Sequence, residues 1–545
     1  MQLKPSAHRD SFTRDHLPPP EQWPLLLFDR PEFHWPDRLN CAVELLDRAV
    51  GEGHGDRPAI LCGDGVWTYA QVRDTADRIA RVLVEDQGLV PGNRVLLRAA
   101  NTPMLFACWF AVMKAGLVAV TTMPMLRAGE LAQVIDKARV DLALCDAALT
   151  TELHGAALDG KPLRVVTFGA PGADLERLVA GKPAGFQAVE TSQDDVCLLA
   201  FTSGTTGQPK ACMHFHRDIM AMCDGFAKHM LDPQPDEIFT GTPPIAFTFG
   251  LGGLLAFPFR FRAAVALPDK AGPTALADCI QRHRATTVFT SPTGYRAMLG
   301  QRGEYDLSSL RKCVSAGEAL PAATSDAWFE ATGIRIVDGI GSTEMIHIFI
   351  SARGDDIRPG ATGLPLPGYQ AALLDEEGRE LDGPATGRLA VRGPVGCRYM
   401  ADERQRNYVQ GGWNVTGDTY RRDGDGRYWF VARADDMIVS AGYNIAGPEV
   451  EQALLAHPAV AECAVVGAPD PERGRIVKAF VVPAAGFAPG DALARELQDF
   501  VKARIAPYKY PRAVAFLDAL PKTQTGKIQR FRLREREEAD ATAGV

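Results

Sequence analysis

The sequence lacks the patterns that mark several large classes of protein. It has eleven cysteines, an odd number, and no two of them form a C-x-x-C pair. A zinc-ribbon spacing and a disulfide framework are therefore not indicated, and we expect buried, reduced thiols. An excess of positive charge is also missing, with 59 Lys and Arg residues against 67 Asp and Glu. The formal net charge is −8, which argues against sequence-independent binding to nucleic acid because such binding needs a basic face.

Long apolar runs are missing as well. The longest, Met104 to Met113, ends at Lys114 and is well short of the roughly 20 residues that span a membrane. The N-terminus carries Lys4, Arg9 and Asp10 and lacks the apolar segment of a signal peptide. We therefore expect a cytoplasmic enzyme with no membrane partner. Its 545 residues exceed what one hydrophobic core supports, which predicts two or more domains.

Between about residue 40 and residue 400, short β-rich runs alternate with helical patterns. Examples are the predicted strands 94–98 and 196–201 and the predicted helix 102–115. Alternation at this spacing predicts parallel α/β layers. A glycine-dense stretch, 416–444, then predicts a domain boundary. The pattern beyond it indicates an α+β unit with helices near 447–455 and 490–505 and strands at 460–467, 476–482 and 513–516. We predict domains at 1–433 and 434–545.

The stretch from Thr202 to Lys210 combines two glycines, four hydroxyl side chains and a lysine directly after the predicted strand 196–201. Glycines let backbone N–H groups approach a ligand, the hydroxyls donate hydrogen bonds, and the lysine adds positive charge. This composition predicts a polyphosphate-binding loop. The spacing differs from G-x-x-x-x-G-K-[ST], so a P-loop fold is not indicated. A polar, glycine-rich turn without a ligand is the alternative.

Five more segments contain residues suited to chemistry. Ser315–Ala319 and Asp338–Glu344 each follow a strand-like run, and the carboxyl ends of parallel strands form the edge where open sheets bind ligands. Trp413–Asp418 ends in a T-G-D turn, Arg433–Ile438 is charged, and Pro521–Ile528 places a lysine beside a glycine. Each could instead be a turn or a linker with no shared site.

Taken together, the order and spacing of these segments from roughly residue 40 to residue 535 resemble those of the adenylate-forming superfamily. That family includes acyl-CoA synthetases, peptide-synthetase adenylation domains and firefly-type luciferases. Its members form an acyl-AMP from a carboxylic acid and ATP and pass the acyl group to a thiol or another acceptor. The resemblance implies an α/β fold with a large N-terminal domain of layered sheets and a smaller, mobile C-terminal α+β domain. It also implies ATP, Mg²⁺ and coenzyme A as ligands.

The resemblance implies a role for each cluster. Lys527 is the main catalytic residue, reaching the acyl carboxylate and the α-phosphate. Thr343 contacts phosphate or the acyl carboxylate, and Glu344 binds Mg²⁺, as does Thr206. Asp435 is the hinge of the C-terminal domain. Asp418 binds the ribose, and Gly442 lies beside the pantetheine arm. The implied cofactor-binding residues are Thr202, Ser203, Gly204, Thr205, Thr206, Lys210, Gly317, Glu318, Asp338, Gly339, Ile340, Gly341, Asp418, Arg433 and Gly442.

The acid would bind between segment 246–252 and the residues after Glu344. Segments 247–252 and 340–349, with the N-terminal 15–19, resemble the benzoate-CoA ligase branch, most closely its 2-aminobenzoate-CoA ligases. Two positions depart from the usual patterns: Ile340 replaces an aromatic residue of the superfamily, and Phe249 replaces a tyrosine of benzoate ligases. The implied substrate-binding residues are Phe247, Phe249, Gly250, Ile340 and His347.

Several alternatives stay open at this point. The aromatic residues could be core residues only, and the acid could be benzoate, salicylate, a hydroxybenzoate or a short aliphatic acid. The acceptor could be a carrier protein instead of free CoA. A non-catalytic nucleotide-binding scaffold would require loss of Lys527 or Glu344, and both are present. The chain could be a monomer or a homodimer.

Overall fold

The structure is a computed structural model that describes residues 3–156, 163–202, 209–301, 303–433, 436–440, 443–470, 474–505, 509–522 and 528–543. Several predicted site residues lie outside these ranges: Ser203, Gly204, Thr205, Thr206, Asp435, Gly442 and Lys527.

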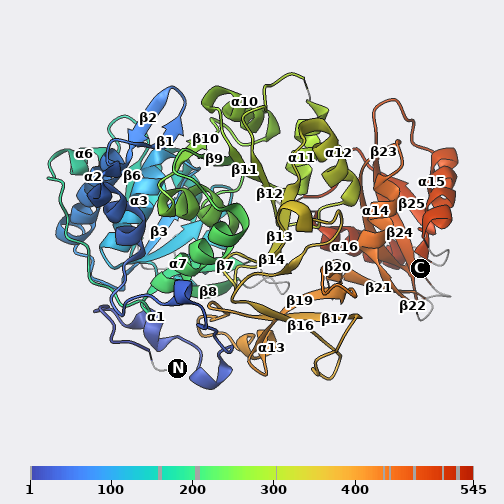
Figure 1. The fold of residues 1–545 in the computed structure, drawn as a ribbon, viewed down its shortest axis with the longest axis horizontal. Helices are drawn as coiled ribbons and strands as arrows, with labels where there is room; N and C mark the ends of the chain where they lie inside the picture. Colours follow the sequence, from blue (N-terminus) through green and yellow to red (C-terminus); the bar gives the residue numbers. More distant parts are fainter. Residues whose placement is uncertain are drawn as a thin grey trace.

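A nine-stranded sheet forms one of two large layers (Figure 1). Its strands, in spatial order, are β15 Leu364–Pro365, β14 Ile348–Ser351, β13 Ile336–Gly341, β12 Lys312–Ser315, β11 Thr287–Thr290, β9 Ile238–Gly241, β10 Ala264–Leu267, β1 Pro58–Cys62 and β2 Gly65–Thr68. The strands from β13 to β1 run parallel, whereas β14, β15 and β2 are antiparallel additions at the edges. The carboxyl ends of β12 and β13 therefore meet at one edge, as predicted for a ligand-binding edge.

A six-stranded sheet forms the second layer. Its order is β6 Val165–Phe168, β5 Leu142–Asp146, β3 Arg94–Arg98, β4 Val118–Thr122, β7 Val196–Thr202 and β8 Lys210–Phe215. Strands β6 to β7 are parallel, and β8 returns antiparallel to β7. The predicted strands 94–98 and 196–201 are thus present, and β8 is an additional edge strand that the alternating pattern did not predict.

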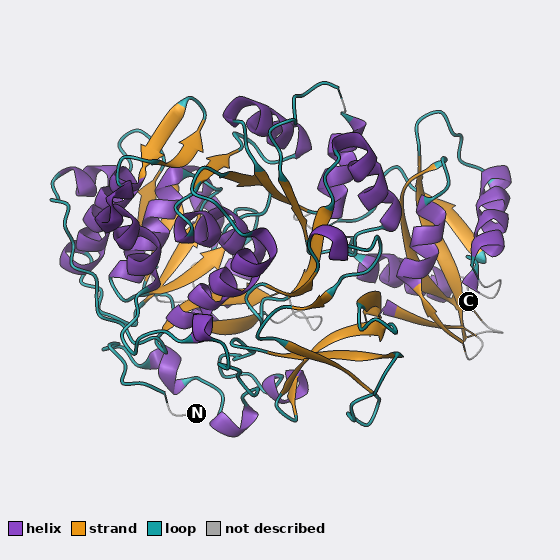
Figure 2. Ribbon diagram, viewed as in Figure 1, coloured by secondary structure: helices purple, strands orange, loops and turns teal. Residues whose placement is uncertain are grey.

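Helices cover these two sheets (Figure 2). Polar residues that satisfy free N–H groups start two of them: Thr68 and Gln71 form a capping box on α2, and Thr102 caps α3 ahead of Pro103. The α-helices up to residue 408 are α1 Phe12–Asp15, α2 Tyr69–Arg81, α3 Pro103–Lys114, α4 Ala128–Ala138, α5 Thr150–Gly155, α6 Asp174–Ala180, α7 His216–Met222, α8 Thr248–Gly250, α9 Phe257–Arg260, α10 Pro273–His283, α11 Pro292–Gly300, α12 Ala322–Thr332 and α13 Gln405–Tyr408.

A five-stranded antiparallel sheet follows, which the sequence patterns did not indicate. It contains β16 Gln370–Leu374, β17 Ala385–Arg392, β18 Val409–Gln410, β19 Trp413–Arg422 and β20 Tyr428–Arg433. Part of the glycine-dense stretch is therefore a β-hairpin. Its turn residues, Asp423 to Gly426, join β19 to β20, and Gly426 has φ +81°. Glycine and aspartate mark hairpin turns as readily as linkers, which explains the difference.

The C-terminal unit is a separate α+β layer at one side of the molecule (Figure 1). It contains the hairpin β21 Met437–Ser440 with β22 Tyr443–Ala446, the sheet β23 Val460–Asp470, β24 Gly474–Pro483 and β25 Ala513–Phe516, and helices α14 Gly447–Leu455, α15 Asp491–Arg504 and α16 Arg530–Ala543. The predicted fold class is confirmed, and the 433/434 boundary stays a prediction. Among the described residues, no helix is long and apolar enough to cross a membrane.

Candidate functional site

The predicted polyphosphate loop lies between β7 and β8, whose last registered pair is Thr202 with Lys210. The hydroxyl oxygen of Thr202 is buried and has no hydrogen-bond partner among the described residues. A buried hydroxyl without a partner is costly, so a ligand that supplies one would be favoured here.

Lys210, Tyr399 and Glu344 form a charged junction between the two large sheets. The Nζ atom of Lys210 donates to Tyr399 Oη at 2.8 Å and lies 3.7 Å from Glu344 Oε1. The phenol of Tyr399 in turn donates to Glu344 Oε1. Burial, together with the charge of Glu344, raises the pKa of Tyr399 far above its usual range, so the phenol stays a neutral donor. The structure thus brings the predicted Lys210 and Glu344 together from separate sheets.

Thr343 and Glu344 lie in the turn between β13 and β14. The backbone N–H of Ile346 donates to the Thr343 carbonyl at 3.1 Å and closes this turn. Gly341 is needed at its base, because a Cβ atom there would lie 2.8 Å from the backbone of His347. The turn therefore holds Glu344 at the carboxyl end of β13, the edge at which we predicted ligand binding.

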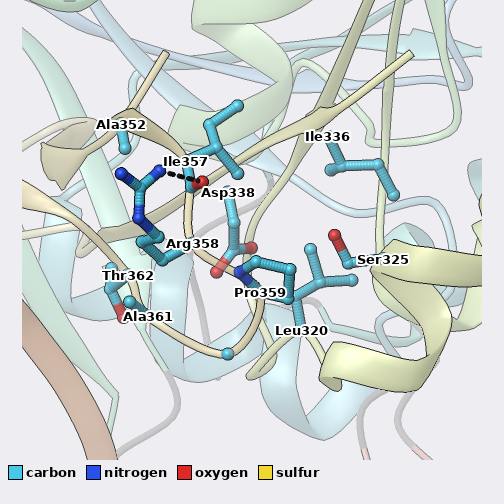
Figure 3. Close-up of a pocket in the computed structure, with 11 residues that line it drawn as sticks. Leu320, Ser325, Ile336, Asp338, Ala352, Ile357, Arg358, Pro359, Ala361 and Thr362 are labelled. Atoms are coloured by element: carbon cyan, nitrogen blue, oxygen red, sulfur yellow. Dashed lines mark hydrogen bonds between the residues drawn. The ribbon is translucent and has the colours of Figure 1, made fainter. Parts of the chain in front are cut away.

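Asp338 is half-buried on β13, opposite Ser315 of β12. Burial raises the pKa of its carboxyl to about 7, although hydrogen bonds from Ser315 and Gly339 oppose the shift. Its Oδ1 atom has no hydrogen-bond partner among the described residues. Figure 3 shows the carboxylate beside Pro359, in a pocket with a volume of only about 10 Å³. A pocket of that volume holds at most one water molecule, so it cannot bind a nucleotide base.

Asp418 and Arg433 face each other across the β19–β20 hairpin, with 3.7 Å between Arg433 Nη1 and Asp418 Oδ1. The buried Tyr420 lies near this pair: burial raises the pKa of its phenol, and the charges of both Asp418 and Asp338 raise it further. The antiparallel sheet therefore brings the predicted ribose-binding residue close to β13, as the predicted shared site requires.

His347 packs against one other predicted acid-binding residue, Phe249, and against Phe226 and Phe257, which the sequence did not single out. Its ring centroid lies 5.0 Å from Phe226, 5.8 Å from Phe249 and 4.8 Å from Phe257. Burial lowers the pKa of His347 to about 3, so the imidazole is neutral near pH 7. The backbone of Phe249 lies close enough to oppose this shift, but by hydrogen-bond geometry neither ring nitrogen has a partner in the described part of the chain. We call this cluster the aromatic wall; Phe226 and Phe257 are buried members of the main core, and Phe249 is partly buried against it.

Not all residues after Glu344 line this wall. Ile346, Ile348 and Phe349 are buried members of the main core, and Ile340 is partly buried against it. Glycines bring the wall close to the backbone of segment 250–253. A Cβ atom on Gly252 would lie 2.5 Å from His347 Cδ2, and one on Gly250 would lie 2.1 Å from the Pro244 carbonyl oxygen. Gly250 therefore lets the backbone of this segment pack directly against the Pro244 carbonyl.

The first turn of α16 lies near Glu318, one of the predicted cofactor-binding residues. Arg530 donates to both oxygens of Glu451, at 3.0 and 2.7 Å. Burial lowers the pKa of Arg530, but the charges of Glu451, Asp436 and Glu318 outweigh this and raise it. Because Glu318 follows β12, the residues directly after Lys527 approach the large domain. Lys527 itself lies outside the described residues.

The motifs did not reveal two residues of the junction, Tyr399 and His214. Tyr399 sits in a segment that pairs with β8, where it opposes Cys212. His214 lies on β8, and its Nε2 atom is 2.8 Å from the Thr343 carbonyl oxygen. Strand periodicity could have identified His214, since Lys210, Cys212 and His214 alternate onto one face. Nothing in the sequence marks Tyr399.

Two family models match the chain. A model described as AMP-binding enzyme matches residues 46–399, and one described as AMP-binding enzyme C-terminal domain matches residues 449–527. The benzoate–CoA ligase of Thauera aromatica is 34% identical over 516 residues, which cover 92% of this chain and 97% of that protein.

Two solved structures share the fold over most of their length. The anthranilate CoA ligase AuaEII, in complex with anthranoyl-AMP, has a TM-score of 0.89 at 34% identity, covering 94% of this chain and 100% of that one. A benzoate CoA ligase from Burkholderia xenovorans LB400 has a TM-score of 0.83 at 33% identity, covering 91% and 100%.

Proposed function

We propose that this chain, which belongs to the AMP-binding enzyme family, is an ATP-dependent ligase that joins an aromatic carboxylic acid to coenzyme A. The reaction would pass through an enzyme-bound aryl-AMP and release pyrophosphate and AMP. The predicted membership in the adenylate-forming superfamily is confirmed, as is the resemblance to its benzoate-CoA ligase branch. The roles of single residues and the identity of the acid are proposals.

One observation carries the proposal: a charged junction and an aromatic wall share a single turn. Glu344, joined to Tyr399 and Lys210, is three residues from His347, which is packed among phenylalanine rings. A polyphosphate would bind at the charged side and an aryl ring at the apolar side. The carboxylate of the acid would then lie between them, next to the α-phosphate, as attack on that phosphate requires.

In the first half-reaction, an oxygen of the aryl carboxylate attacks the α-phosphorus of ATP, and the bond to pyrophosphate breaks. Lys210 would bind the leaving phosphates, and Lys527 would stabilise the negative charge that develops at the α-phosphate. Glu344 fits a Mg²⁺ ligand, because it is a buried carboxylate 3.7 Å from Lys210 and Mg²⁺ in such sites takes one or two carboxylates plus substrate phosphates. Mg²⁺, when bound, would neutralise phosphate charge; Thr206 is its second proposed ligand.

In the second half-reaction, the sulfur of CoA attacks the acyl carbon, and AMP leaves with the electron pair of the broken acyl–oxygen bond. Asp418 would hold the ribose, since a carboxylate can accept from both hydroxyls. Gly442 would leave room for the pantetheine arm, and rotation about Asp435 would exchange the two arrangements of the C-terminal domain. A cytoplasmic location, where both ATP and CoA are found, is part of the proposal.

For the acid, we favour 2-aminobenzoate or benzoate. The aromatic wall suits a planar ring, and both nitrogens of the neutral His347 lack a partner among the described residues. An ortho amino group could pair with one of them, whereas benzoate would leave it unsatisfied. The same buried nitrogen disfavours an aliphatic acid of similar size. The anthranilate CoA ligase among the structural relatives is consistent with this preference.

The test is pyrophosphate release with benzoate, 2-aminobenzoate, salicylate, 4-hydroxybenzoate, acetate and octanoate, each with and without CoA. The proposal expects turnover with an aromatic acid that depends on CoA. Adenylation without CoA turnover would favour loading of a carrier protein instead. Preference for acetate or octanoate would contradict the role given to the aromatic wall.

A further inference from the structure

His214 is buried beside the turn that carries Glu344, with 1% of its surface exposed. Strand β8 places it on the same face as Lys210 and Cys212, whereas Ala211, Met213 and Phe215 pack into a hydrophobic cluster on the other face. A polar ring at this depth needs hydrogen-bond partners.

The ring bridges the phosphate-side turn to a buried carboxylate. Its Nε2 atom is 2.8 Å from the Thr343 carbonyl oxygen, so an N–H at Nε2 donates to that oxygen. Its Nδ1 atom lies 3.6 Å from Asp218 Oδ2. The Thr343 carbonyl therefore accepts two hydrogen bonds, one from His214 and one from the backbone N–H of Ile346.

The turn that receives these hydrogen bonds is strained. Ile346 has φ +63° and is fully buried. A β-branched residue rarely adopts this left-handed conformation, and holding one there costs of order 1–3 kcal/mol. Such a conformation persists only where surrounding contacts fix it. The His214 hydrogen bond acts on the residue directly before Glu344, which the turn must present to the phosphates.

Asp218 is itself held in place. Its Oδ2 atom accepts from Arg398 Nη2 at 2.5 Å and from the backbone N–H of Phe215 at 2.9 Å. Burial raises the pKa of its carboxyl, but the charge of Arg398, the neighbouring His214 ring and the charge of Arg217 outweigh this and lower it to about 2. Asp218 is thus a fixed carboxylate beside the His214 ring, whose Nδ1 atom has no hydrogen-bond partner among the described residues.

We propose that His214 is a positioning residue for adenylation: through its hydrogen bond to the Thr343 carbonyl, it fixes the strained Thr343–Ile346 turn so that Glu344 can ligate Mg²⁺ on bound ATP. This inference rests on the Mg²⁺ role proposed for Glu344. His214 touches neither ATP nor the acid; it acts through the Thr343 carbonyl.

The test is the affinity for ATP measured by calorimetry, with Mg²⁺ and with EDTA, in three proteins. These are the wild type, His214→Gln, whose amide can still donate to Thr343, and His214→Leu, which cannot donate. We expect His214→Leu to lose at least tenfold in affinity for MgATP while its affinity for ATP in EDTA stays within twofold. His214→Gln should stay within about threefold in both. His283→Gln, on α10 outside the site, is the control for loss of a histidine.

A His214→Leu protein that keeps the full gain in affinity from Mg²⁺ would overturn the proposal, as would a wild type that shows no such gain. An equal loss in both conditions would mean that His214 only supports the fold. If the leucine variant does not fold, His214→Asn, one methylene shorter than glutamine, takes its place. If the wild type adenylates no acid yet shows the expected pattern, the proposed function fails while the positioning role stands.

Discussion

Replacing Gly252 with alanine should disable the acid site without touching the phosphate site. The new Cβ atom would lie 2.5 Å from His347 Cδ2, 2.7 Å from His347 Nε2 and 2.8 Å from Phe257 Cζ. These distances are about 1 Å shorter than ordinary contact, so the imidazole must shift by a comparable amount. Misplacement of a site by ~1 Å can cost up to ~10²-fold in rate.

We therefore expect Gly252→Ala to lower kcat/KM for benzoate or 2-aminobenzoate at least tenfold, with the KM for ATP within twofold. Overpacking should also lower stability by about 1–3 kcal/mol. Gly129→Ala is the matched control: a Cβ atom on Gly129, in α4, meets nothing within 4 Å. Its activity should be unchanged. The assays are pyrophosphate release and thermal unfolding.

If Gly252→Ala has the same kcat/KM for the aromatic acids as the wild type, the reasoning is refuted, because the His347 ring would then not be part of the acid site. An equal fall in kcat/KM for the acid and for ATP would also count against it, since that would indicate a general packing defect.

Three further outcomes are expected. Tyr399→Phe removes the phenol that links Lys210 to Glu344, and should lower the adenylation rate about tenfold or more with little change in the KM for the acid; an unchanged rate would show that the link is dispensable. Asp338→Asn should raise stability at pH 8 but not at pH 4. The folded-state pKa of Asp338 is raised from 3.8 to about 7, so the native state binds a proton that the unfolded state has lost, and stability falls as pH rises between these values. Melting temperatures at both pH values check the sign, and a gain confined to pH 4 would reverse it. Lys527→Ala should reduce overall turnover far more than tenfold; a smaller loss would remove it from the catalytic step.

The sequence predicted elements well where local patterns decide them. The strand 94–98, the helix 447–455 and the strand 513–516 have their predicted bounds, because apolar runs and turn residues delimit them. The antiparallel sheet 370–433 was not predicted. Its strands β16 and β17 are neighbours in the chain, but no local period distinguishes antiparallel strands from those of a parallel layer.

The site was predictable where a motif carries the chemistry and not where tertiary pairing supplies it. Lys210 and Glu344 stand out as charged residues beside glycine turns, and the structure joins them through Tyr399. Tyr399 reaches them only because its segment pairs with β8, a contact between residues nearly two hundred positions apart. The unpaired nitrogens of His347 are likewise a property of packing, which no residue pattern contains.

The central claim is that the aromatic wall around His347 selects an aromatic acid for ATP-dependent ligation to CoA. The most direct measurement is CoA-dependent pyrophosphate release with 2-aminobenzoate, benzoate and octanoate in the wild type and in His347→Leu. The account predicts kcat/KM for 2-aminobenzoate above that for benzoate, and both above octanoate, with the preference for 2-aminobenzoate lost in the variant. Faster turnover of octanoate by the wild type, or a preference unchanged in His347→Leu, would contradict it.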